Sequence, residues 1–189
     1  MEQIEDSLIP SKPRASRRMH VLHGLGGIGK TQLAIQYARK HQKKYSAILW
    51  INGSSKDTLL QSFASFATNA RIEGIPKAAI QVAEHGQETL ERTKAVLRWL
   101  ACDRNERWLL IFDNVDRDPH GTVQDPQAYD IESFLPDADH GSILVTSRLP
   151  HLGQLGTSTK VTTVNGEQAF QILTDNSGLS PNAPGKPFN

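Results

Sequence analysis

Eight consecutive residues, Gly24–Thr31 (GLGGIGKT), match the phosphate-binding pattern G-x-x-x-x-G-K-[ST]. Glycines in such a loop allow backbone conformations that turn successive N–H groups toward phosphate oxygens. Lys30 can bring a positive charge to the β- and γ-phosphates, and Thr31 can offer a hydroxyl group to Mg²⁺. The alternative is an ordinary glycine-rich turn, but an apolar run precedes the loop and an amphipathic stretch follows it. The pattern therefore predicts a binding site for a nucleoside triphosphate.

A carboxylate and an arginine follow two other apolar runs of the chain. Asp113 ends the run WLLIFD, and Arg148 follows the run SILVT after one serine. A buried strand that ends in a carboxylate can present a fixed anion to a metal ion, so we expect Asp113 to hold Mg²⁺ together with Thr31. Aspartate at a strand end is more often a turn or helix cap, and its pairing with the phosphate-binding pattern is what favours the metal.

Apolar runs and amphipathic stretches alternate along the chain, which is typical of parallel strands joined by helices. We expect strands at residues 19–23, 47–51, 108–112, 142–146 and 160–164, and helices at residues 30–41, 88–101 and 167–173. Another helix should follow Ser54 and Asp57, which can cap its N-terminus. The predicted fold class is α/β, a three-layer sandwich with a mainly parallel sheet of the P-loop NTPase kind. Ligands bind beyond the carboxyl ends of such strands, where the phosphate loop, Asp113 and Arg148 should converge.

The remaining segments are polar or rich in proline and glycine. Residues 1–18 lack periodicity and should be flexible or loosely packed, and residues 176–189 should form a C-terminal tail. Residues 19–175 are then one nucleotide-binding domain. We also expect residues 71–88 to be mostly loop and residues 116–130 to form an exposed insertion.

The composition limits the partners and the compartment of the chain. The 189 residues include 21 basic and 20 acidic ones and carry a net charge of +1, which favours neither nucleic acid nor an anionic membrane surface as a partner. The single cysteine, Cys102, excludes an internal disulfide and should be a small buried residue at the end of a helix. No apolar run approaches the ~20 residues that a transmembrane helix needs. We expect a soluble protein of the reducing cytoplasm.

Three longer segments carry a resemblance to a known family. They are GLGGIGKTQLAIQYA (Gly24–Ala38), WLLIFDNVD (Trp108–Asp116) and GSILVTSR (Gly141–Arg148). In order and spacing they resemble the Walker A, Walker B and sensor-1 segments of NB-ARC domains, which belong to the STAND class of P-loop ATPases and act as nucleotide switches in plant and fungal NOD-like receptors. The stretch Val161–Leu173 is similar to the strand and helix that close this nucleotide-binding subdomain. The resemblance covers about residues 19–173.

The resemblance implies an ATP/ADP-binding switch with Mg²⁺, acting in an immune- or signalling-type receptor whose other domains, or further copies of the chain, are its partners. It also implies that Arg148 meets the γ-phosphate, because a guanidinium can bridge phosphate oxygens with two hydrogen bonds. A solvated arginine after a strand is the alternative. The implied nucleotide-binding residues are Gly24, Gly26, Gly27, Ile28, Gly29, Lys30, Thr31, Gln32 and Arg148. The residues implied in any hydrolysis are Asp113, Asn114 and Arg148.

The chain departs from the family pattern directly after Asp113. Many members carry a second acidic residue there, which helps to polarise the attacking water, whereas this chain has Asn114. An amide can orient water but does not accept its proton as a carboxylate does, so hydrolysis should be slow or absent unless Asp116 supplies a base. We therefore expect a weak ATPase at most.

Other parts of the family pattern are not recognisable. The adenine-contacting Gly-Arg element is not seen in residues 1–18, and nothing after Leu173 matches the family's helical and winged-helix subdomains, so we expect an isolated nucleotide-binding subdomain. Two other functions stay open. One is a catalytically active P-loop NTPase or small-molecule kinase. The other is a degenerate domain that no longer binds nucleotide, which the intact Gly29-Lys30-Thr31 disfavours.

Overall fold

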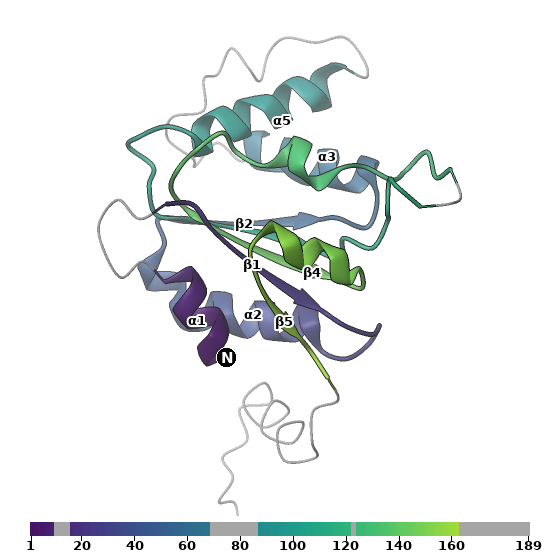
Figure 1. The fold of residues 1–189 in the computed structure, drawn as a ribbon. Coiled ribbons are helices and arrows are strands. Elements are labelled where there is room, and N and C mark those ends of the chain that lie inside the picture. Colours follow the sequence, from purple (N-terminus) through teal and green to yellow (C-terminus); the bar gives the residue numbers. More distant parts are fainter. Residues whose placement is uncertain (10–15, 69–86, 122–123, 163–189) are drawn as a thin grey trace, which may run out of the picture.

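The computed structural model describes residues 1–9, 16–68, 87–121 and 124–162, which form one parallel β-sheet with helices on both faces (Figure 1). The strand order is β2-β3-β4-β1-β5, and every neighbouring pair is parallel. The strands are β1 (Arg18–His23), β2 (Ala47–Asn52), β3 (Trp108–Asp113), β4 (Ser142–Ser147) and β5 (Thr157–Lys160). The predicted α/β three-layer fold of the P-loop NTPase kind is thus confirmed.

The helices divide between the two faces of the sheet. In Figure 1, α1 (Glu2–Leu8) and α2 (Lys30–His41) lie on one face, and α3 (Lys56–Thr68) and α5 (Gln87–Leu100) lie on the other. In the described part of the chain, short 3₁₀ helices connect other elements: η1 (Gln42–Lys44), η2 (Ile131–Phe134) and η3 (Pro150–Leu155).

Strand β3 (WLLIFD) is apolar at every position except its last. Trp108, Leu110 and Phe112 pack in the core beneath α3 and α5, whereas Leu109 and Ile111 pack in the core beneath α1 and α2. Successive side chains of a strand point to opposite faces, so a strand covered by helices on both sides needs apolar side chains on both. All five of these side chains are fully buried.

The predicted helix at residues 30–41 is α2, with the predicted bounds. Helix α3 is also present, but Ser55 caps it rather than Ser54 or Asp57. The Oγ of Ser55 accepts a hydrogen bond from the Thr58 N–H at 3.2 Å, and the Oγ1 of Thr58 accepts one from the Ser55 N–H at 3.0 Å. This reciprocal pair is a capping box in which threonine takes the usual place of glutamate.

Strand β5 begins earlier than predicted. It covers Thr157–Lys160 instead of residues 160–164 and pairs with β1. Its sequence, TSTK, contains no apolar side chain, because a largely exposed strand at the edge of a sheet needs no buried face. The predicted helix at 167–173, the tail at 176–189 and nearly all of the predicted loop at 71–88 lie outside the described residues. Cys102 is exposed rather than buried, because it lies in a turn beyond the end of α5.

The first residues form a packed helix. Ile4 and Leu8 of α1 are buried in the core shared with α2, and the Oγ of Ser142 donates a hydrogen bond to the Leu8 carbonyl at 2.8 Å. The prediction of a loosely packed segment is therefore wrong for residues 2–8, because two apolar side chains spaced i, i+4 bury one face of the helix and hydrogen bonds hold its other groups. Residues 10–15 of that segment lie outside the described residues.

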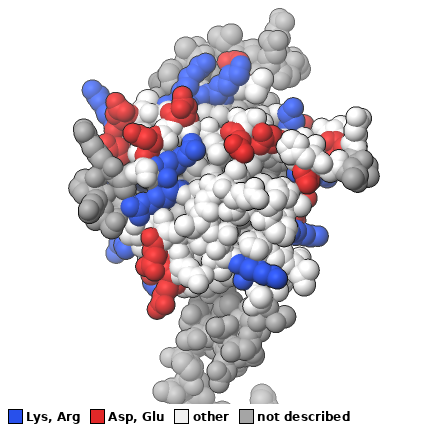
Figure 2. Space-filling view, viewed as in Figure 1, with Lys and Arg blue, Asp and Glu red and all other residues white. Residues whose placement is uncertain are grey.

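Charges of both signs are distributed over the face shown in Figure 2. Acidic and basic side chains are interspersed around its margin, whereas the middle, over η3, is uncharged. Within the described part of the chain, no helix is long and apolar enough to cross a membrane.

His20 of β1 connects α1 with β5. It is 1% exposed, and its Nδ1 lies 2.8 Å from the Oγ of Ser7 and 2.9 Å from the Oγ1 of Thr157. Its Nε2 lies 3.0 Å from the Oγ1 of Thr159. Burial in this position lowers the pKa of His20 from 6.5 to about 4, because the charged imidazolium would lose its hydration.

This shift predicts a specific pH dependence of stability. Between pH 6.5 and 4 the unfolded chain binds a proton at His20 that the folded chain does not, so the free energy of unfolding should fall with decreasing pH, by roughly 2–3 kcal/mol from this group. Urea unfolding at several pH values gives the slope of the unfolding free energy against pH. His20→Asn should remove the part of that slope that comes from His20. The same substitution at the exposed His151 controls for the loss of an imidazole, and an unchanged slope in His20→Asn would contradict the prediction.

Candidate functional site

The Gly24–Thr31 loop joins the carboxyl end of β1 to the N-terminus of α2, as predicted. Gly24, Gly27 and Gly29 have φ values of 152°, 73° and 96°, a region that residues with a Cβ rarely adopt. There is also no room for a side chain at Gly24, since a Cβ there would lie 2.4 Å from the carbonyl oxygen of Val161. The backbone of this loop therefore depends on glycine at three positions, and the positive end of the α2 dipole lies directly beyond it.

Lys30 is directed back into the phosphate loop. Its Nζ donates hydrogen bonds to the carbonyl oxygens of Gly24 at 2.9 Å and Leu25 at 2.8 Å, and the residue is only 9% exposed. Burial lowers the pKa of Lys30, while the negative charges of Asp116 and Asp113 act in the opposite direction. The loop thus holds a partly desolvated ammonium group against its own carbonyl oxygens, where its charge can attract an anion.

Asp113 ends β3 and receives two hydroxyl groups at one oxygen. Its Oδ1 accepts hydrogen bonds from the Oγ1 of Thr31 at 2.8 Å and from the Oγ1 of Thr146 at 2.6 Å. The predicted pair of Thr31 and Asp113 is therefore in direct contact. Thr146 of β4 is a further member of the site that the sequence reasoning missed. The available signal was a hydroxyl-bearing residue near the carboxyl end of an otherwise apolar run.

Asn114 adopts a left-handed backbone conformation directly after β3. Its φ is 66°, which asparagine tolerates better than most residues with a side chain, and its N–H donates to the Oγ1 of Thr146 at 2.9 Å. The residue is exposed and lines the same hollow as the phosphate loop. The backbone at this position is thus held while the amide side chain is accessible to a ligand.

Arg148 lies over the phosphate loop and is bound by Asp116. Its main-chain N–H donates to Oδ1 of Asp116 at 2.7 Å, and its Nε donates to Oδ2 at 2.8 Å. Both carboxylate oxygens of Asp116 are therefore engaged, which disfavours the predicted alternative that Asp116 serves as a free base. A Cβ on Gly26 would lie 3.1 Å from the Cζ of Arg148, so the guanidinium packs against this glycine. Gly26 does not share the positive φ of the other loop glycines; its lack of a side chain makes room for Arg148.

These residues surround a hollow of about 230 Å³ at the carboxyl edge of the sheet. Asp113 lies behind its lining, bonded to Thr31, and Gly24 forms the start of the loop. The lining residues are Gly26, Gly27, Ile28, Gly29, Lys30, Thr31, Gln32, Asn114, Thr146 and Arg148. The residues proposed from the sequence are thus brought together at one place.

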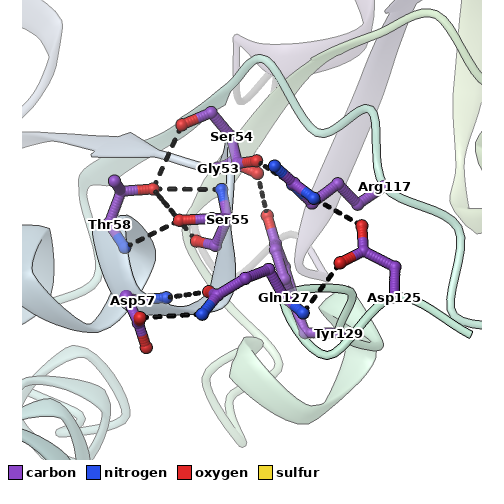
Figure 3. A network of polar contacts seen from close by, with 9 residues as sticks. All are labelled: Gly53, Ser54, Ser55, Asp57, Thr58, Arg117, Asp125, Gln127 and Tyr129. Atoms are coloured by element: carbon purple, nitrogen blue, oxygen red, sulfur yellow. Dashed lines mark hydrogen bonds and ion pairs between the residues drawn. The ribbon is translucent and has the colours of Figure 1, made fainter.

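The predicted insertion at residues 116–130 is docked on the start of α3 (Figure 3). The Nε of Arg117 donates to the Ser54 carbonyl at 2.7 Å, and its Nη1 pairs with Asp125 at 2.5 Å. The hydroxyl of the buried Tyr129 donates to the Gly53 carbonyl at 2.6 Å. The predicted insertion is thus exposed in part, for example at Pro119 and His120, but it is also docked, since Tyr129 is buried and polar side chains of the segment bind backbone groups just beyond β2.

A model of the NB-ARC domain family matches residues 1–180 of this chain. The chain belongs to the NB-ARC family. This membership confirms the resemblance seen in the three sequence segments and makes the chain a nucleotide-binding domain. The NB-ARC match and the parallel sheet agree on a P-loop NTPase fold.

The NB-ARC domain is also similar to part of a larger protein. It is 23% identical over 156 residues to a nucleotide-binding leucine-rich repeat (NLR)-like protein of Hyaloscypha variabilis. The similarity covers 78% of this chain and 15% of that protein. The chain therefore spans only a small part of the length of this relative.

Proposed function

We propose that this NB-ARC domain is the ATP/ADP-binding switch of a larger, cytoplasmic NLR-like receptor, and that it hydrolyses ATP slowly or not at all. The observation that carries the proposal is the position of the Arg148 guanidinium against Gly26 of the phosphate loop. A cation at that place can contact the outermost phosphate of a triphosphate and has no such partner in a diphosphate. The name of the relative from Hyaloscypha variabilis supports an immune- or signalling-type receptor as the setting.

Thr31 and Asp113 suit the Mg²⁺ ion that accompanies a nucleotide. A hydroxyl and a carboxylate oxygen are ligands of the hard kind that Mg²⁺ prefers, and they lie 2.8 Å apart directly beside the phosphate loop. When bound, Mg²⁺ would neutralise part of the phosphate charge. Thr146 also donates a hydrogen bond to Oδ1 of Asp113 and would keep that carboxylate in place.

Slow hydrolysis follows from the residues available near the phosphate loop. Asn114 can orient a water molecule through its amide but does not accept the proton as a carboxylate would. Asp116 uses both oxygens to bind Arg148. The proposed switch thus binds and distinguishes nucleotides and has little means of consuming them.

The proposed partners are the nucleotide and other domains of the receptor or further copies of this chain. The mixed surface charge in Figure 2 offers no support for nucleic acid as a partner. A small-molecule kinase would need arginines over an acceptor site, but Arg117, the single arginine between residues 114 and 140, is bound to Asp125 and the Ser54 carbonyl.

The phosphate loop supplies the first test. Lys30→Ala should weaken the binding of both ATP and ADP by about 10- to 100-fold, because charge-assisted hydrogen bonds of ~1.5–3 kcal/mol are lost. Isothermal titration calorimetry with and without Mg²⁺ measures this change. The exposed Lys43, replaced by alanine, is the control for general charge. Equal nucleotide affinity in Lys30→Ala and the parent chain would contradict the proposal that the phosphate loop binds the nucleotide through Lys30.

Arg148 should provide the discrimination between the two nucleotides. Arg148→Ala is expected to weaken ATP binding more than ADP binding, by about 1–3 kcal/mol, since the γ-phosphate loses a charged hydrogen-bond donor. The ratio of the two dissociation constants is the measured quantity, and the exposed Arg104→Ala is the matched control. Equal losses for ATP and ADP would mean that Arg148 does not contact the γ-phosphate.

The amide at position 114 should limit turnover. The chain is expected to hydrolyse ATP far below the ~10 s⁻¹ typical of enzymes, and Asn114→Asp should raise the rate with little change in nucleotide affinity. Asparagine and aspartate both tolerate the left-handed backbone found here, so the substitution should not strain the fold. Phosphate release measured at saturating ATP decides the matter. Fast hydrolysis by the unmodified chain would favour the alternative of a catalytically active NTPase.

A further inference from the structure

Asp116 holds Arg148 through two separate hydrogen bonds. One carboxylate oxygen accepts from the main-chain N–H and the other accepts from the side-chain Nε, at 2.7 and 2.8 Å. The side chain of Asp116 is 18% exposed, whereas that of Arg148 is 61% exposed. Asp116 is therefore the more buried partner of the pair, and it binds the main-chain N–H and the Nε of an arginine whose side chain is largely exposed.

The loop that carries Asp116 is itself attached to β4. The Val115 N–H donates to the Thr146 carbonyl at 2.9 Å, and the Oγ of Ser147 donates to the Val115 carbonyl at 2.5 Å. Ser147 Oγ also accepts the N–H of Leu149 at 2.9 Å. Thr146 and Ser147 of β4 are thus bonded to Val115, the residue that precedes Asp116, so the carboxylate is held close to the start of the segment that carries Arg148.

We propose that Asp116 is the positioning residue of Arg148, holding its Nε and main-chain N–H so that the two terminal Nη groups stay over the phosphate loop for a γ-phosphate. This inference rests on the proposed function, in which Arg148 distinguishes ATP from ADP. A guanidinium has five N–H donors in a planar fork, so binding at Nε leaves the outer donors available. The guanidinium also packs against Gly26, so it lies between Asp116 and the phosphate loop.

The carboxylate also has an effect that opposes binding. Its negative charge lies close enough to act on Lys30, and it repels the phosphates of any nucleotide. Removing Asp116 therefore changes the affinity for ATP and ADP together through charge and changes their ratio through the position of Arg148. The ratio of the two affinities separates positioning from charge.

A double-mutant cycle on the full chain tests the proposal. Dissociation constants for ATP and ADP are measured by calorimetry for the parent, Asp116→Ala, Arg148→Ala and the double variant. Asp116→Ala should lower the preference for ATP over ADP by about 3- to 10-fold, and adding it to Arg148→Ala should change the preference no further. Asp116→Asn keeps one acceptor oxygen and should give an intermediate preference; it also replaces the alanine variant if that does not fold. Asp118→Ala, on the same loop and bonded to the His120 N–H, is the control.

The outcomes separate this inference from the function on which it rests. If Arg148→Ala leaves the ATP preference unchanged, the role of Arg148 fails and the positioning role fails with it. If Arg148→Ala lowers the preference but both Asp116 variants keep it, only the role of Asp116 is overturned. A higher ATP preference in Asp116→Ala would also overturn it, because the aspartate would then restrain Arg148 away from the phosphate. Additive effects in the double variant would do the same.

Discussion

Oδ1 of Asp113 accepts hydrogen bonds from Thr31 of α2 and from Thr146 of β4, while Asp113 itself ends β3. In the sheet, β4 separates β3 from β1 and therefore from the phosphate loop that follows β1. A side chain must bridge this gap if a carboxylate on β3 is to act together with the loop, and the two hydroxyl groups provide that bridge. Two of the residues that line the hollow, Asn114 and Arg148, directly follow β3 and β4. The main chain of Asn114 is held directly by this bridge, because its N–H donates to the Oγ1 of Thr146.

The central elements of the fold could be predicted from the sequence because their burial leaves a strong pattern. Strands covered on both faces need several apolar side chains in a short run, and the four predicted runs agree with β1 to β4 within one residue at each end. The pattern fails where few side chains are buried. Helix α1 buries Ile4 and Leu8, and the four residues of β5 are polar, so neither leaves a periodic signal long enough to recognise.

The site could be predicted in its motifs but not in its internal contacts. The phosphate loop, Asp113 and Arg148 were expected at one edge because parallel strands place their carboxyl ends together. Thr146 and the Asp116–Arg148 pair depend on hydrogen bonds between residues that are remote in the sequence, and threonine in a strand or aspartate in a loop has many possible roles. The role of Gly26 could not be predicted either, because it depends on a contact with the distant Arg148. Sequence alone suggests backbone freedom for every glycine of the loop, whereas this one leaves space for a guanidinium.

The exit of the chain from β5 is tied to the start of the phosphate loop. The Val161 N–H donates to the His23 carbonyl at 2.8 Å, and the Val161 carbonyl occupies the space that a side chain on Gly24 would need. Val161 therefore contacts both the last residue of β1 and the first residue of the phosphate loop. A displacement of the main chain at Val161 would therefore disturb the bond to His23 and the packing against Gly24. The conformation at the start of the phosphate loop and the path of the chain after β5 are in this way linked at Val161.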